Sequence, residues 1–225
     1  MADLVIEKVN EVYLKIHTEP HVEYELRDRF TFEVPNMKFM PQYRKRHWNG
    51  EIHLFDIRTK RIYVGLLDKI VAFCEKAGYS YTFAKNKFYG LPFEVNEMVN
   101  PEGVKDFMAS ITALKPRDYQ IDAVSDALRY NRKLLISPTA SGKSFMIYSI
   151  VRFFVNAGKK ILLVVPTTSL VEQMFKDFQD YGWDAENHCH RIYAGRERVN
   201  TNEVTITTWQ SVYQLDRKFF EEYDV

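Results

Sequence analysis

The sequence predicts an α/β fold: a doubly wound parallel sheet preceded by a small α+β domain. The sheet is predicted by the almost wholly apolar run 160–165 and by the alternation of strand-like and helix-like segments after residue 114. An apolar run of this kind is typical of a parallel strand covered on both faces, and such alternation favours parallel strands joined by helices. Short alternating segments within residues 1–90 predict the smaller domain.

Composition limits the class of protein without naming a partner. The chain has 225 residues, is 46% hydrophobic and carries a net charge of +1. No apolar run is long enough to span a membrane, and Asp3 and Glu7 interrupt the start where a signal peptide would need apolar residues. Cys74 and Cys189 lack metal-site spacing, so we expect reduced thiols in a cytoplasmic protein.

The small domain, residues 1–90, contains alternating strand patterns and two helical patterns. Gly78 follows the second helical pattern, where it suits a helix end. The expected elements are a hairpin over 4–16, a helix over 21–30, an extended segment over 31–39, strands at 52–56 and 61–64, a helix over 66–77 and a strand at 79–83.

A local excess of basic charge lies within this domain. Residues 38–61 contain seven basic residues against two acidic ones, Glu51 and Asp56, a difference of +5. The aromatic side chains among them are Phe39, Tyr43, His47 and Trp48. The pattern predicts that Arg44, Lys45 and Arg46 bind a nucleic-acid backbone while Trp48 stacks on bases. The alternative is a solvated loop with Trp48 in the core.

Residues 91–113 are punctuated by Pro and Gly and are interpreted as a linker, so residues 114–225 form the second domain. Its expected elements are a helix over 121–130, a strand at 134–136, a helix over 145–155, a strand at 160–165, a helix over 171–181, and strands at 191–193 and 204–208.

A phosphate-binding loop is predicted between the apolar run 134–136 and the helix over 145–155. It ends in Gly142, Lys143 and Ser144. Glycine lets the backbone approach phosphate oxygens, and amides at a helix start attract an anion. The lysine reaches terminal phosphates and the serine hydroxyl suits Mg²⁺, so the sequence predicts a phosphate ligand with Mg²⁺ here; the resemblance described next implies that this ligand is ATP.

Four stretches follow one another along the chain: residues 117–120, 138–144, 165–173 and 207–211. Together, in this order, they resemble the first RecA-like domain of superfamily 2 helicases. By that resemblance Arg117, Tyr119 and Gln120 recognise adenine, with Gln120 as the base contact. The implied phosphate and magnesium loop consists of Pro138, Thr139, Ala140, Ser141, Gly142, Lys143 and Ser144, with Lys143 and Ser144 catalytic. The implied contacts to the nucleic-acid backbone are Pro166, Thr167, Thr168, Gln173, Thr208 and Gln210.

The N-terminal part also resembles the recombination helicases of T-even bacteriophages, through residues 24–28, 44–50 and 65–67. That resemblance implies an ATP-dependent DNA helicase acting on forks, junctions and R-loops in phage recombination, repair and replication. Branched or duplex DNA is the implied partner, with an RNA–DNA hybrid left open. We expect a monomer in the cytoplasm of a bacterial host.

The Asp-Glu pair that this family uses to hold magnesium is missing after Thr208. We therefore expect an N-terminal fragment, truncated before that motif, that binds DNA but does not hydrolyse ATP; whether it binds nucleotide stays open. Alternatives are a DNA translocase subunit of a restriction-type enzyme, a DNA-binding module with a vestigial phosphate loop, and a small-molecule kinase.

Overall fold

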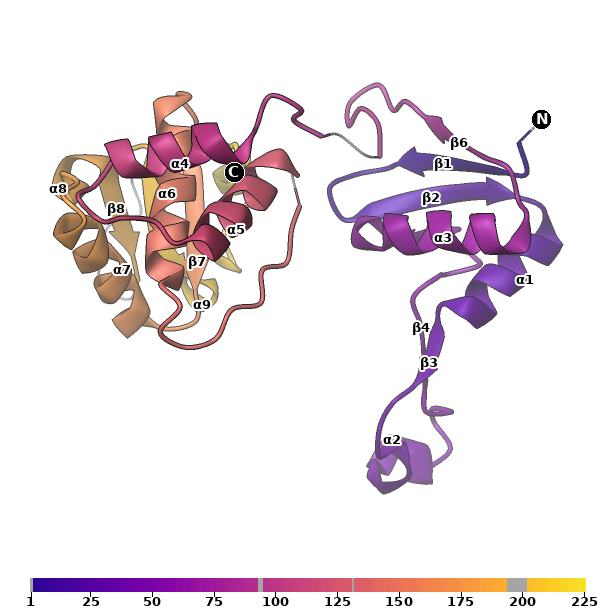
Figure 1. Cartoon of the computed structure of the whole chain (residues 1–225). Coiled ribbons are helices and arrows are strands. Elements are labelled where there is room, and N and C mark those ends of the chain that lie inside the picture. Colours follow the sequence, from indigo (N-terminus) through magenta and orange to yellow (C-terminus); the bar gives the residue numbers. More distant parts are fainter. Residues whose placement is uncertain (1, 93–94, 131, 194–201) are drawn as a thin grey trace. The chain divides into compact units, whose positions relative to one another are not determined.

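The computed structural model describes residues 2–92, 95–130, 132–193 and 202–225 (Figure 1). The chain divides into two compact units, Met1–Glu94 and Val95–Val225, and each has a hydrophobic core of its own. Among the described residues, no helix is both long and apolar enough to cross a membrane.

A four-stranded sheet in the order β5-β2-β1-β6 supports the first unit. Its strands are β1 (Leu4–Lys8), β2 (Tyr13–Thr18), β5 (Arg61–Tyr63) and β6 (Tyr81–Ala84). The predicted hairpin is confirmed, because β1 and β2 pair antiparallel with Ile6 opposite Ile16. The Asn10 side chain closes its turn by accepting the amides of Val12 and Tyr13, each at 2.8 Å.

Two helices pack against this sheet through one core. They are α1 (Pro20–Arg29) and α3 (Leu67–Ala77), the latter preceded by the 3-10 turn η2 (Val64–Leu66). Helical spacing brings Leu67, Ile70 and Cys74 of α3 into the core formed by alternate residues of β1 and β2. The helix ends as predicted at Gly78, whose φ of +78° favours glycine.

A second, two-stranded ladder extends from the first unit (Figure 1). It pairs β3 (Thr31–Glu33) with β4 (Glu51–His53), and the residues between them form the turn η1 (Met37–Phe39) and the helix α2 (Pro41–Arg44). We call residues 34–50 the tip segment. The strands predicted on either side of the turn at 58–60 exist, but β4 pairs with β3 whereas β5 pairs with β2.

The second unit contains a parallel sheet in the order β7-β9-β8. Every residue of β9 is buried, which requires cover on both faces because successive side chains point to opposite sides. The predicted doubly wound parallel sheet is confirmed. Its elements are α4 (Pro101–Ser110), α5 (Asp118–Arg129), α6 (Lys143–Asn156), β7 (Ile161–Val165), α7 (Thr168–Asp180), α8 (Ala185–His188), β8 (Cys189–Ile192), β9 (Val204–Thr208), α9 (Trp209–Val212) and α10 (Arg217–Phe220).

Part of the segment interpreted as a linker belongs to the core of the second unit. Residues 93–94 lie outside the described residues, but α4 lies within the interval 91–113. Val104 and Met108 are one helical turn apart, so they face the same side and are both buried in the second core. Asn100 caps this helix by accepting the Gly103 amide at 2.8 Å.

The strand predicted at residues 134–136 is not formed. Leu134 is 82% exposed and Ile136 91% exposed. An apolar run becomes a strand only where a neighbour completes its hydrogen bonds, and none of the described residues pairs with it. One edge of β7 pairs with β9, and at the other edge Leu162 N donates to Val225 O at 2.8 Å.

Candidate nucleotide and nucleic-acid sites

The predicted phosphate loop opens α6 through two residues with left-handed backbone. Gly142, at φ +79°, caps the helix, and Ala140 has φ +64°. A side chain on Gly142 would collide with the Gln120 amide, so both the backbone angle and the space require glycine. A strained non-glycine residue such as Ala140 is typical of a loop shaped for a ligand.

The Lys143 ammonium folds back onto this loop. Its Nζ donates to Pro138 O at 2.6 Å and to Ser137 O at 3.1 Å. An incoming phosphate competes with these neutral carbonyls, and a charged acceptor forms the stronger bond with an ammonium. Lys143 is therefore positioned to transfer its hydrogen bonds to a terminal phosphate.

Ser144, the predicted magnesium ligand, is half-buried on the first turn of α6. Tyr181, the residue that follows α7, places its ring 5.7 Å from that of Phe145, the next residue of α6. Burial, with smaller contributions from Asp177 and Asp180, raises the pKa of Tyr181, so this phenol stays neutral at physiological pH.

Gln120 is buried against the phosphate loop with both ends of its amide engaged. Its Nε2 donates to Ser141 O at 2.9 Å, and its Oε1 accepts from Arg117 N at 3.0 Å. Tyr119 Oη donates to the same Ser141 carbonyl at 2.9 Å and accepts from the Arg117 guanidinium at 3.1 Å. All three residues predicted to recognise adenine therefore meet, and two of them hold the loop directly.

The predicted backbone contacts follow two neighbouring parallel strands. Val165 and Thr208 are register partners at the carboxyl ends of β7 and β9, so the residues after each strand reach the same edge of the sheet. Parallel sheets of this type bind ligands at that edge. The predicted contacts that are exposed there or on the following helix are Pro166, Thr167, Thr168, Gln173 and Gln210.

Thr208 is buried, whereas the other predicted backbone contacts of the second unit are exposed. It is only 3% exposed, and its hydroxyl is 2.9 Å from that of Ser211. Next to it, Trp209 is 59% exposed and its ring lies 6.1 Å from that of Tyr213. Tyr213 was not selected from the sequence, although its spacing of four from Trp209 signals neighbours on a helical turn. Trp183, by contrast, packs in the core.

The predicted basic patch separates into two regions. Arg58 and Lys60 lie in the turn before β5, and Arg61 is the first residue of β5 in the four-stranded sheet. Lys60 pairs with the buried carboxylate of Glu23 at 2.7 Å. The remaining basic residues lie in the tip segment, which contains no acidic residue. Counting charges along the sequence overestimated the size of the basic patch, because Lys60 forms an ion pair with Glu23.

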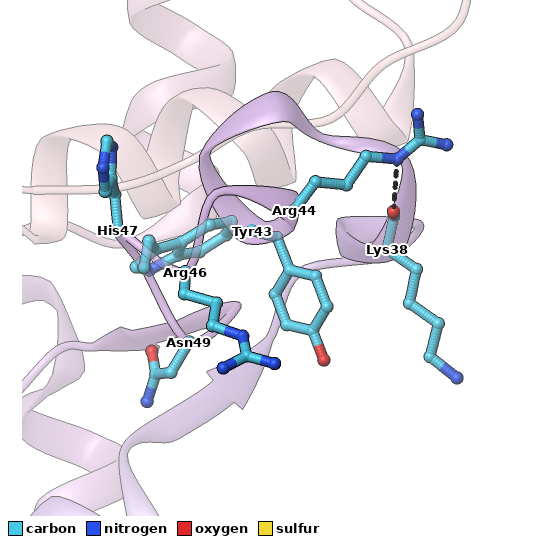
Figure 2. Close-up of a pocket in the computed structure, with 7 residues that line it drawn as sticks. Lys38, Tyr43, Arg44, Arg46, His47 and Asn49 are labelled. Atoms are coloured by element: carbon cyan, nitrogen blue, oxygen red, sulfur yellow. Dashed lines mark hydrogen bonds between the residues drawn. The ribbon is translucent and has the colours of Figure 1, made fainter.

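The tip segment encloses an open hollow of about 620 Å³, which we call the tip hollow. In Figure 2 the Tyr43 ring lies between the side chains of Arg46 and Lys38. Arg44 Nε donates to Lys38 O at 3.3 Å. The residues that line the hollow are Lys38, Tyr43, Arg44, Arg46, His47, Trp48 and Asn49, of which the sequence had selected Arg44, Arg46 and Trp48.

The parallel sheet and the loop that opens α6 define the second unit as a RecA-like domain of the P-loop class. The chain belongs to the family described as type III restriction enzyme, res subunit, whose model matches residues 113–225. A second family model, DNA helicase UvsW, N-terminal, matches residues 4–84.

The chain is similar over nearly its whole length to a phage protein. It is 29% identical over 222 residues to the ATP-dependent DNA helicase uvsW of Enterobacteria phage T4, covering 94% of this chain and 43% of that relative. Two crystal structures of the T4 UvsW helicase align with TM-scores of 0.81 and 0.82 at 28% identity. Both cover 98% of this chain, and the chain covers 80% and 45% of them, respectively. The expected resemblance to phage recombination helicases is confirmed.

Proposed function

We propose that this chain carries the nucleotide-binding and DNA-binding parts of an ATP-dependent DNA helicase that acts on branched DNA. The observation that carries the proposal is that the similarity to the T4 helicase runs through both units, over 94% of the chain. The geometry of the phosphate loop, with Gly142 capping α6 and Lys143 at its start, supports the nucleotide-binding part.

Each group of residues has a separate task in this proposal. Loop amides and Lys143 bind the phosphates of ATP, the Ser144 hydroxyl takes part in binding the accompanying Mg²⁺, and Gln120 contacts the adenine. Lys143, together with the Mg²⁺ that Ser144 would help to hold, would neutralise charge on the phosphates of the nucleotide. Because Tyr119 and Gln120 both bond Ser141 O, the residues that select the base also shape the loop that holds the phosphates.

The DNA contacts come from both units. Arg44, Lys45 and Arg46 of the tip segment neutralise backbone phosphates, which gives affinity without sequence preference. In the second unit, Thr167 and Gln210 are exposed just after the ends of β7 and β9, and in this proposal they contact the sugar-phosphate backbone of one DNA strand. Forks, junctions and R-loops formed during phage recombination, repair and replication are the proposed substrates, processed by a monomer in the cytoplasm of the host.

A second candidate is a DNA translocase subunit of a restriction enzyme. The description of the family that matches residues 113–225 favours it. The match of residues 4–84 to the N-terminal model of a DNA helicase favours the first candidate. The two candidate functions differ in what happens to the DNA. A translocase moves along intact duplex, whereas a helicase of this kind separates the strands at a branch.

The proposal is tested on the intact protein that contains this chain. ATP hydrolysis and strand separation are measured with forked DNA and with a linear duplex of the same length and sequence, using Lys143→Ala as the control. We expect the fork to stimulate hydrolysis and to be unwound, and Lys143→Ala to abolish both. Hydrolysis on linear duplex without unwinding of the fork would favour the translocase instead.

A further inference from the structure

We propose that the tip hollow binds an unpaired nucleotide, with the base against Tyr43 and Trp48 and its flanking phosphates on Arg44 and Arg46. This inference rests on the proposed function, because it names the form of nucleic acid that the first unit takes. Three observations support it: the contacts that hold the tip segment together, the chemistry of the residues that line the tip hollow, and the engagement of the Asn49 amide in that lining.

The tip segment is held together by specific contacts. Val34 N donates to Gly50 O at 2.8 Å, and Met37 packs so closely on Gly50 that a side chain there would collide with its sulfur. Gly50 has φ +87° and Arg46 has φ +58°, a left-handed conformation that is uncommon outside glycine. Strained residues that the surroundings hold in place are typical of ligand clamps, so the tip segment has the character of a preformed site.

The lining of the hollow combines aromatic rings with cations. Tyr43, His47 and Trp48 supply the rings, and no carboxylate lines it. The Trp48 indole N–H donates to Glu51 O at 2.8 Å, which fixes the orientation of the ring. Glu51 does not line the hollow, so this bond leaves the lining residues available to a ligand. Aromatic surface and positive charge together are the combination that binds single strands, because rings stack on bases while cations bind phosphates.

The aromatic lining of the hollow favours an unpaired nucleotide over a base-paired one. Bases of a duplex are already stacked on their neighbours, so aromatic walls add stacking only for a base that is unpaired. The size of the hollow, about 620 Å³, lies within the usual range of ligand pockets. A strand end or an unpaired nucleotide at a branch is the substrate that offers such a base.

Recognition in the hollow does not depend on sequence. Asn49 is the one amide side chain in the lining, and amides are suited to reading base edges. Its Nδ2 donates to a Glu51 carboxylate oxygen at 2.7 Å, and its Oδ1 accepts from Glu51 N at 3.1 Å. Since both ends of the amide are engaged, stacking and charge carry the recognition, and both tolerate any base.

The test measures binding of the 225-residue chain to four labelled probes by fluorescence anisotropy over a salt series. The probes are a single strand of DNA, the same strand with abasic sites, and a blunt duplex; an RNA strand distinguishes DNA from RNA as the source. The variants are Trp48→Ala, Tyr43→Ala and Trp48→Phe. The matched controls are Phe88→Ala and Arg58→Ala, which change exposed residues outside the hollow.

We expect Trp48→Ala and Tyr43→Ala each to weaken single-strand binding roughly tenfold, a typical effect of removing a stacking partner. Duplex affinity and the salt dependence stay unchanged, because every cation that binds a phosphate is still present. Trp48→Phe retains a ring and most of the affinity. The abasic strand binds the wild type as weakly as the intact strand binds Trp48→Ala.

Three results would overturn the inference. Equal affinity of the wild type for intact and abasic strands means that no base enters the hollow. Equal weakening of duplex and single strand by both alanine variants means that the tip segment contacts only the backbone. If the wild type binds none of the probes, DNA binding by this chain, and with it the proposed function of the first unit, is wrong. Tyr43→Ala keeps the test decisive if Trp48→Ala alters folding, which thermal melting detects.

Discussion

The side-chain amide of Gln120 donates to the carbonyl of Ser141 over 2.9 Å and thereby ties the first turn of α5 to the phosphate loop. Tyr119 donates to the same oxygen. A base contact made by Gln120 has to replace or share these bonds, because the other end of the amide already accepts from Arg117 N. In the proposed site, binding of the base and the shape of the phosphate loop would therefore be coupled through the Ser141 carbonyl.

Replacing Gln120 tests this coupling. We expect Gln120→Ala to weaken ATP binding and to reduce the preference for ATP over GTP, because it removes both the proposed base contact and a bond to the loop. Tyr119→Phe is the comparison variant, since it keeps Gln120 and removes the bonds of the Tyr119 hydroxyl to Ser141 O and to the Arg117 guanidinium, each worth about 0.5–1.5 kcal/mol. It should weaken ATP and GTP equally. Titration with fluorescent nucleotide analogues measures both effects, and an unchanged ATP preference in Gln120→Ala would remove Gln120 from base recognition.

Lys143 is expected to bind the phosphates and not the DNA. Lys143→Ala should weaken nucleotide binding by the chain at least tenfold, because it removes a charge-assisted hydrogen bond to phosphate, while leaving affinity for forked DNA within about twofold. Equilibrium titrations with nucleotide and with labelled fork measure the two affinities separately. Lys105→Ala, which removes an exposed charge on α4, controls for net charge. Retained nucleotide binding in Lys143→Ala would show that this loop is not the site.

The 225-residue chain by itself should not turn over ATP. No Asp-Glu pair follows β9 in its sequence, and such a pair supplies the carboxylates that hold the metal during transfer. Phosphate release is measured with and without forked DNA, and Lys143→Ala gives the background. Turnover of the wild type clearly above that background would contradict the prediction and require a different source of metal ligands.

The basic residues of the tip segment should dominate the salt dependence of DNA binding. Each cation that binds a phosphate releases counterions, so replacing Arg44, Lys45 and Arg46 with Gln should lower the slope of log K against log salt by about one unit for each phosphate that is no longer bound. The reduction should be the same for different DNA sequences. Arg58→Gln, outside the tip segment, is the control and should leave the slope unchanged. A triple variant with wild-type slope and affinity would disprove backbone binding by these residues.

The two cysteines should be unreactive in the folded protein. Burial raises the pKa of Cys189 to about 12 and also raises that of Cys74, so neither is a thiolate at pH 8. A thiol reagent should modify neither before denaturation and both after it. The pKa of Cys189 in the folded protein lies above its ordinary value of about 9. The stabilisation that the buried neutral thiol gives to the folded state is therefore complete below pH 9. This contribution decreases as pH rises toward 12, and chemical denaturation at pH 8 and 11 measures the decrease. Rapid modification of the native protein would show that the thiols are accessible.

The order of the phosphate-loop motif could be predicted from sequence because it depends on residues next to each other. Gly142, Lys143 and Ser144 begin a helix, and the positive φ of Gly142 is a local requirement that only glycine meets cheaply. The predicted helices from α5 to α7 are confirmed for the same reason, since helical periodicity is local. The prediction of a strand at 134–136 was wrong because a strand needs a neighbouring strand to complete its backbone hydrogen bonds, and the apolar character of the segment does not supply one.

The sequence by itself therefore determined the helices α1, α3 and α5 to α7, the parallel strands β7 to β9 and the identity of the loop residues, all of which follow from short-range pattern and backbone geometry. Only the tertiary structure decided that Gln120 holds Ser141, 21 residues away, and that Lys60 pairs with Glu23 rather than joining a basic patch. It also decided that Lys38 and Asn49 line one hollow. Contacts between distant residues depend on how elements pack, and packing is a property of the folded chain as a whole.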